Sequence, residues 1–200
     1  IYFKEMINDT LFIINDEMQL ELVYYFNLGK YSQPIEERKL GPFEMIENIE
    51  NYIFIKNIFD SKHYLFFDCN FGKHSPAKRQ KPVEKYGTIS EYYTNSVLGV
   101  FDKNSGEVVF SLPIQEKNHF LNTGFYNDFD NGLNFYPRER VNDSTFAMWI
   151  YAYILKEHIF SDTFKSSTPK HPEKKKELEQ LANSLNENDN PVLMLVKLKD

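Results

Sequence analysis

The sequence predicts an all-β fold: a partial β-propeller of four-stranded antiparallel blades, with one amphipathic helix near the C-terminus. Two observations predict this class. Short apolar segments recur between turns rich in Asn and Asp, and aromatic residues make up 16% of the 200 residues. Aromatic side chains favour the half-buried surface of a sheet, and small antiparallel sheets repeated along a chain are typical of propellers and sandwiches. Roughly ten strands are too few to close a ring of such blades, so the single domain over residues 1–200 should be an incomplete propeller.

The first predicted blade unit covers residues 1–30. Its three strands are expected at residues 1–6, 10–14 and 19–26. Residues 8–9 and 15–17 separate them, and they are rich in Asn and Asp, whose side chains favour turns by bonding the neighbouring main chain. Pro and Gly then make residues 31–51 a connector without regular structure.

The second predicted unit covers residues 46–113. Its four strands are expected at residues 52–59, 63–69, 97–103 and 107–112. The first two are nearly continuous apolar runs, which is typical of strands buried on both faces. A polar insertion at residues 71–95 separates the second and third strands. Because Gly72, Pro76 and Pro82 stand among its lysines, we expect an exposed, solvated loop there.

The third predicted unit covers residues 120–200 and includes the helix. Its strands are expected at residues 132–136, 145–155 and 192–199. We interpret Trp149, inside the second of these, as a core anchor. Pro172 suits the first turn of the helix, and Pro191 follows its end. The apolar stripe of the helix has i, i+3, i+4, i+7 spacing and consists of Leu178, Leu181, Ala182 and Leu185.

Composition and charge exclude several classes of function. The net charge of −6 argues against a nucleic-acid partner, which would need clustered positive charge. Cys69 is the only cysteine, which excludes a disulfide within the chain, and we expect it to be a small buried hydrophobe. No apolar run reaches the length of a membrane span. The five histidines share no metal-ligand spacing and no Gly-rich phosphate loop occurs, so we expect neither metal nor cofactor.

The strongest candidate for a site is the segment at residues 127–132, which contains Asn127, Asp128 and Asp130 followed by Gly132. Its alternating oxygen-bearing side chains resemble the start of a calcium loop, although no bidentate Glu follows at the required distance. Three interpretations stay open. The segment is a turn capped by its own Asx side chains, a ligand-binding site in a propeller mouth, or a metal site.

Arg138 is a second candidate for ligand binding. It follows the Tyr-Pro dipeptide that ends the predicted strand at residues 132–136, and Glu139 and Arg140 come directly after it. These three side chains would either bind an anionic ligand or form a solvated cluster of ion pairs.

Several segments resemble a family of six-bladed β-propeller proteins of unknown function from gut-type Bacteroidetes. They lie at residues 8–12, 29–31, 127–132 and 186–199, and the last is the most specific. The resemblance covers nearly the whole chain and the C-terminal part of such a protein. It implies a protein of the cell envelope, in the periplasm or anchored to the outer membrane, often through an N-terminal lipidated cysteine that Cys69 does not match. It supplies no catalytic residues.

These observations favour a non-enzymatic binding or scaffold module whose partner is a small molecule, a glycan or a protein. The alternative is a propeller hydrolase or lyase acting on glycans or lactones at the channel mouth, with Asp128 and Asp130 joined by groups from other blades. Open sheet edges would expose apolar surface. We therefore expect either that residues upstream of Ile1 have been removed or that two copies pair as a homodimer through their open blade edges.

Overall fold

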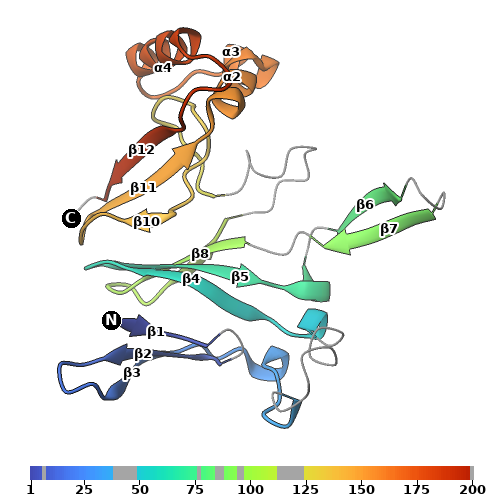
Figure 1. Cartoon of the computed structure of the whole chain (residues 1–200), viewed down its shortest axis with the longest axis vertical. Coiled ribbons are helices and arrows are strands. Elements are labelled where there is room, and N and C mark those ends of the chain that lie inside the picture. Colours follow the sequence, from blue (N-terminus) through green and yellow to red (C-terminus); the bar gives the residue numbers. More distant parts are fainter. Residues whose placement is uncertain are drawn as a thin grey trace. The chain divides into compact units, whose positions relative to one another are not determined.

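A computed structural model describes residues 1–5, 8–37, 49–75, 78–83, 88–93, 97–111 and 124–198 of the chain (Figure 1). Antiparallel sheets with few helices make up most of it, in agreement with the all-β expectation. The chain divides into two compact units. One contains Ile1–Ile58 and Phe67–Gly99, and the other contains Phe59–Phe66 and Val100–Asp200.

The first sheet has three strands, β1 (Tyr2–Phe3), β2 (Thr10–Ile14) and β3 (Leu20–Tyr25), paired antiparallel in that order. The Asx turns predicted between them are present. Asn8 Oδ1 accepts a hydrogen bond from the Thr10 amide (3.0 Å), and Asn15 Oδ1 accepts from the Gln19 amide (2.9 Å). Two short 3-10 helices follow, η1 (Gly29–Tyr31) and η3 (Ile49–Asn51).

The second sheet has the four strands that the sequence predicts, hydrogen-bonded in the order β4-β5-β8-β9. Their bounds are Phe54–Asp60, Tyr64–Asn70, Val97–Asp102 and Val108–Phe110, and a 3-10 helix, η4 (Gly72–His74), follows β5. Consecutive residues of β5, from Leu65 to Cys69, are buried, as expected for a strand covered on both faces. Burial, together with the neighbouring Asp68, raises the pKa of the Cys69 thiol to about 12, which keeps it neutral at pH 7.

The insertion at residues 71–95 contains more regular structure than the predicted loop. Strands β6 (Lys78–Val83) and β7 (Thr88–Tyr93) form a two-stranded antiparallel sheet. Pro82 lies in β6 opposite Ile89, a position that an edge strand tolerates. The β-branched and aromatic residues of β7 favour pairing over an irregular loop. The exposure expected for these side chains lies outside what the structure describes.

The third sheet has three strands, in the order β10 (Glu139–Arg140), β11 (Thr145–Ile150) and β12 (Val192–Lys197), all antiparallel (Figure 1). The strand predicted at residues 145–155 is too long, since β11 ends at Ile150. The strand predicted at residues 132–136 is reduced to a single bridge between Phe125 and Phe135.

Three helices occupy the C-terminal part, where the sequence predicted one. They are α2 (Ala152–Phe160), α3 (Asp162–Ser166) and α4 (Pro172–Ser184), of which only α4 was expected. The prediction missed α2 because residues 150–155 are a short apolar run, which periodicity cannot assign to strand or helix. Ser161 is the N-cap of α3, and its Oγ accepts a hydrogen bond from the Phe164 amide (3.1 Å). Within the described ranges, no helix has the length and apolarity that a membrane span requires.

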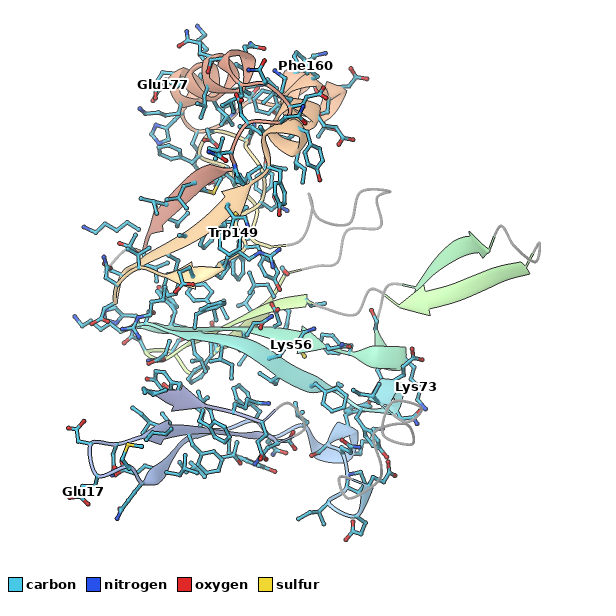
Figure 2. The ribbon with its side chains drawn as sticks, viewed as in Figure 1. Glu17, Lys56, Lys73, Trp149, Phe160 and Glu177 are labelled. Atoms are coloured by element: carbon cyan, nitrogen blue, oxygen red, sulfur yellow. The ribbon has the colours of Figure 1, made fainter. Side chains whose placement is uncertain are left out.

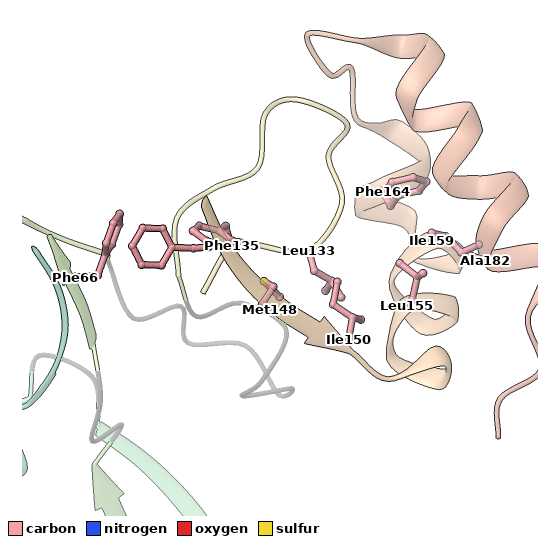
Figure 3. Close-up of a cluster of buried hydrophobic side chains, with 10 residues drawn as sticks. Phe66, Leu133, Phe135, Met148, Ile150, Leu155, Ile159, Phe164 and Ala182 are labelled. Atoms are coloured by element: carbon pink, nitrogen blue, oxygen red, sulfur yellow. The ribbon is translucent and has the colours of Figure 1, made fainter. Parts of the chain in front are cut away.

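One buried apolar cluster forms the core of the second unit (Figure 3). Its members come from β5, β11, the three helices and the loop before β10: Phe66, Leu133, Phe135, Phe146, Met148, Ile150, Leu155, Ile159, Phe164 and Ala182. The apolar stripe predicted for α4 packs against it through Ala182, Leu178 and Leu185. Leu181 is 41% exposed and lies at the rim.

Trp149 is not a core anchor, because 47% of it is exposed. Side chains alternate between the two faces of a strand. Met148 and Ile150 on either side of it are buried in the cluster, so Trp149 projects from the opposite face of β11 (Figure 2).

Candidate functional site

Asx side chains shape the predicted site at residues 127–132 from within. Asp130 Oδ1 accepts hydrogen bonds from the Gly132 amide (2.8 Å) and from Asn127 Nδ2 (2.7 Å), and Asn127 Oδ1 accepts from the Phe129 amide (3.2 Å). A Cβ on Gly132 would lie 2.9 Å from Asp130 Oδ1 and 3.0 Å from Leu178 Cδ2, which explains the glycine. The segment is therefore a turn capped by its own side chains, as one of the three interpretations predicts.

The same loop is fastened to the start of α4. Asp128 Oδ2 forms an ion pair with Lys170 Nζ (2.5 Å), and the main-chain carbonyl of Asp128 accepts from the Lys170 amide (2.8 Å). The next carbonyl, that of Phe129, accepts from the His171 amide (2.9 Å), and the rings of Phe129 and His171 are 4.3 Å apart between centroids. These contacts hold the loop in one place beside the third sheet.

A metal ion at this loop would need several ligand side chains. Among the described residues, no group of three or more His, Cys, Asp or Glu side chains could hold one. His158 Nε2 lies 2.8 Å from the Asn131 carbonyl oxygen, and the ring of His171 packs on that of Phe129. The two aspartates instead interact with Lys170 and with the loop's own amides.

Strand β12 borders the loop and has an unpaired edge in the described part of the sheet. In an antiparallel ladder, residues whose main-chain groups face the partner alternate with residues whose groups face away. The Leu198 amide donates to the Ser144 carbonyl (2.7 Å), so the even-numbered residues of β12 face β11. The main-chain groups of the odd-numbered residues consequently point away from β11, in the plane of the sheet. These residues are Leu193, Leu195 and Lys197.

A pocket of about 640 Å³ lies between this strand and the loop. This volume is within the range of small-molecule and cofactor pockets. The lining consists of Phe125, Tyr126, Asn127, Asp128, Phe129, Asp130, Phe135, Met194, Leu195, Val196 and Lys197. Because four consecutive residues of β12 contribute, the pocket runs alongside its main chain.

The structure thus brings three of the four predicted site residues into one pocket. The aromatic lining, and the position of the loop beside the open edge of β12, were not predicted. A sequence signal for the lining is present, because three aromatic residues stand among the Asx residues at 125–129.

Arg138 lies elsewhere. Its guanidinium carbon is 4.7 Å from the centroid of the Tyr136 ring, and it lines a different pocket of the same unit. Arg140 forms an ion pair with Asp143, a residue outside the predicted cluster of Arg138, Glu139 and Arg140.

The fold and the site together define a β-rich chain with a ligand-sized pocket along an unpaired strand edge. A family model described as a domain of unknown function, DUF4934, matches residues 1–197. The chain therefore belongs to this family. The searches of curated proteins and of solved structures gave no match.

Proposed function

We propose that the chain is a non-enzymatic binding module that holds an extended segment of a partner protein along the open edge of β12. The observation that carries this proposal is the pocket of about 640 Å³ beside main-chain groups that point out of the sheet. Strand addition uses such an edge for affinity and pockets for alternate side chains for specificity.

The two faces of β12 suggest which peptide would bind. On the outer face Leu193 and Leu195 are 60% and 58% exposed, so apolar side chains of the added strand would cover them. On the inner face the aromatic rings of Phe125, Phe129 and Phe135 line the pocket. Apolar residues are therefore favoured on both faces of the bound segment, and unpaired exposed edges of this kind are otherwise a liability.

The enzyme alternative, a hydrolase or lyase, would need convergent carboxylates with a free role in proton transfer. The two carboxylates that line this pocket already have partners: Asp128 interacts with Lys170, and Asp130 accepts two hydrogen bonds inside the loop. We therefore favour binding over catalysis.

We further infer that the sheets are blades of an incomplete six-bladed β-propeller, and that the protein works in the bacterial cell envelope. The succession of three-, four- and three-stranded sheets along the chain, with the two-stranded sheet of β6 and β7 as an insertion in the second, supports the blade assignment. The envelope location rests on the resemblance to the Bacteroidetes propeller proteins alone.

Selection of phage-displayed octapeptides on the chain tests the binding proposal. We expect selected peptides to be rich in β-branched and apolar residues. Leu195→Pro should abolish their binding, because proline removes an outward N–H while leaving the β11–β12 ladder intact. Leu195→Thr removes the same side chain and keeps the N–H, so it should retain binding within a few fold.

Two outcomes would contradict the proposal: the absence of enriched peptides, or equal peptide binding by the two Leu195 variants. Light scattering separates a partner protein from a second copy of the chain. A dimer that Leu195→Pro converts to a monomer would identify the occupant of the edge as β12 of another copy, in place of a foreign peptide.

A further inference from the structure

A second pocket, of about 340 Å³, lies where β11 leads into α2. Three aromatic residues that follow one another at two-residue steps line it: Trp149 on β11, Tyr151 directly before α2 and Tyr153 in its first turn. None of them belongs to the pocket along β12. An inference about this pocket therefore does not depend on the proposed function.

The three rings are open to solvent although they are among the largest apolar groups in the chain. Trp149 is 47% exposed, and Tyr151 and Tyr153 are each 51% exposed. The two tyrosine rings are nearly parallel, with an interplanar angle of 22° and a centroid separation of 5.9 Å. Trp149 lies on β11 and Tyr153 in the first turn of α2, with Tyr151 between the two elements, and Figure 2 shows Trp149 on the strand. Rigid aromatic faces gathered at a pocket are typical of a binding surface.

Arg138 is the one charged residue among the described residues that line this pocket. Its guanidinium lies over the ring of Tyr136, 4.7 Å from the centroid, which holds the side chain at the wall. Arg140, two residues further along, forms an ion pair with Asp143, whereas no carboxylate of the described residues pairs with Arg138. A guanidinium in this setting suits a carboxylate ligand, which it binds through two parallel hydrogen bonds.

We propose that this pocket binds a sugar ring that bears a carboxylate, such as a uronate unit of an acidic glycan. The C–H face of a pyranose ring would stack on Tyr151, Tyr153 or Trp149, and its carboxylate would pair with Arg138. The pocket volume is at the lower end of the range for ligand sites, which suits a single ring at the end of a chain.

Trp149 gives a direct readout because it is the single tryptophan of the chain and it lines the pocket. The experiment titrates the full chain with D-glucuronate and D-galacturonate while tryptophan emission is recorded. D-glucose, D-galactose and sodium acetate serve as matched probes that lack either the charge or the ring. We expect saturable changes in emission with the two uronates only.

Arg138→Gln should weaken uronate binding at least about tenfold, because it removes a charge-assisted contact. Arg138→Lys keeps the charge without the bidentate geometry and should bind with intermediate affinity. Arg140→Gln is the matched control, since it removes a neighbouring arginine outside the pocket, and it should bind like the wild type. Far-UV circular dichroism confirms that each variant is folded.

Each alternative result overturns the proposal. An emission spectrum unchanged by both uronates shows that the pocket does not take these rings. Equal responses to the uronates and the neutral sugars show that Arg138 does not recognise a carboxylate. A response to acetate as strong as that to glucuronate shows a simple anion site without a role for the aromatic rings.

Discussion

At the scale of single residues, lysine side chains cap the C-termini of α3 and α4. Lys175 of α4 donates to the carbonyls of Phe164 (2.5 Å) and Ser167 (2.8 Å) at the end of α3, and its Nζ is 4.6 Å from the Phe164 ring centroid. Lys156 of α2 caps the C-terminus of α4, because its Nζ donates to the carbonyl of Leu185 (2.8 Å). A cation at a helix C-terminus satisfies carbonyls that have no partner within the helix.

Lys175→Met should therefore lower the free energy of unfolding by about 1–2 kcal/mol, since the α3 carbonyls lose a charged donor. Lys176→Met is the control, because the adjacent side chain on the same helix is exposed, and it should change stability by less than about 0.5 kcal/mol. Urea denaturation followed by circular dichroism measures both. Equal losses in the two variants would show that the contacts of Lys175 contribute nothing.

Cys69 should make stability fall at alkaline pH. Burial raises the pKa of its thiol to about 12 from a reference value of 9.0, so the folded state binds the proton more tightly than the unfolded state. The stability contributed by the neutral thiol is present below pH 9 and is lost as the pH rises toward 12. Between pH 8 and pH 10.5 the wild type should lose about 2 kcal/mol more than Cys69→Ala. Urea denaturation at both pH values measures this difference, and identical pH slopes would contradict it.

The turn residues could be predicted from the sequence because their hydrogen-bond partners lie close to them in the chain. The turns at Asn8 and Asn15 were predicted because an Asx side chain bonds the main chain two to four residues away. The same holds for Asn127 and Asp130, whose partners lie inside their own loop. The exposure of Trp149 was not predicted, because it depends on which face of β11 the remote helices cover.

At the scale of elements, the sequence predicts an apolar stretch where β11 and α2 lie, but packing determines where the strand ends and the helix begins. Residues 145–155 are one apolar stretch, and the sequence gives no turn residue at the point where the strand ends. The helical signal lies in Ala152, Leu155 and Ile159, which are buried and have i, i+3, i+7 spacing. This spacing becomes decisive only when Phe164 and Ala182 supply a core for that face.

Leu155→Ala tests this assignment. Leu155 is 1% exposed inside the cluster, so its truncation should cost about 2–5 kcal/mol through lost burial and the cavity that remains. Leu193→Ala removes the same atoms from a site that is 60% exposed, and it should cost less than about 0.5 kcal/mol. Thermal and urea unfolding give both values. A loss below 1 kcal/mol for Leu155→Ala would mean that this face of α2 is not buried.

The pairing of β12 is a second feature of elements that the sequence does not determine. Its strand was predicted at residues 192–199 from the apolar run that follows Pro191, but the sequence does not say which strand pairs with it. Pairing of β11 with β12 joins segments more than 40 residues apart, with three helices between them. Such long-range contacts carry no local signal, so the pocket between β12 and the loop at residues 125–130 could not be predicted from either segment alone.

At the scale of the whole molecule, each compact unit is built from two separate stretches of sequence. The second unit takes Phe59–Phe66 from the middle of the chain and combines it with Val100–Asp200. Phe66 is 4% exposed in its core, with ring centroids 5.1 Å from Phe146 and 6.2 Å from Phe125. Phe59 also packs on Phe146, at 6.4 Å. The short stretch therefore completes the core of the larger one.

A fragment of residues 100–198 should consequently fail to fold, because it lacks Phe59 and Phe66 and leaves one side of Phe146 uncovered. Loss of one buried Phe costs about 3–5 kcal/mol, which is a large part of the stability of a domain of this size. Joining residues 59–66 to residues 100–198 through a flexible Gly-Ser linker restores the complete unit and should restore folding. Near-UV circular dichroism and Trp149 emission distinguish the two chains. A cooperative unfolding transition in the shorter fragment would show that the core of the second unit does not need the stretch from Phe59 to Phe66.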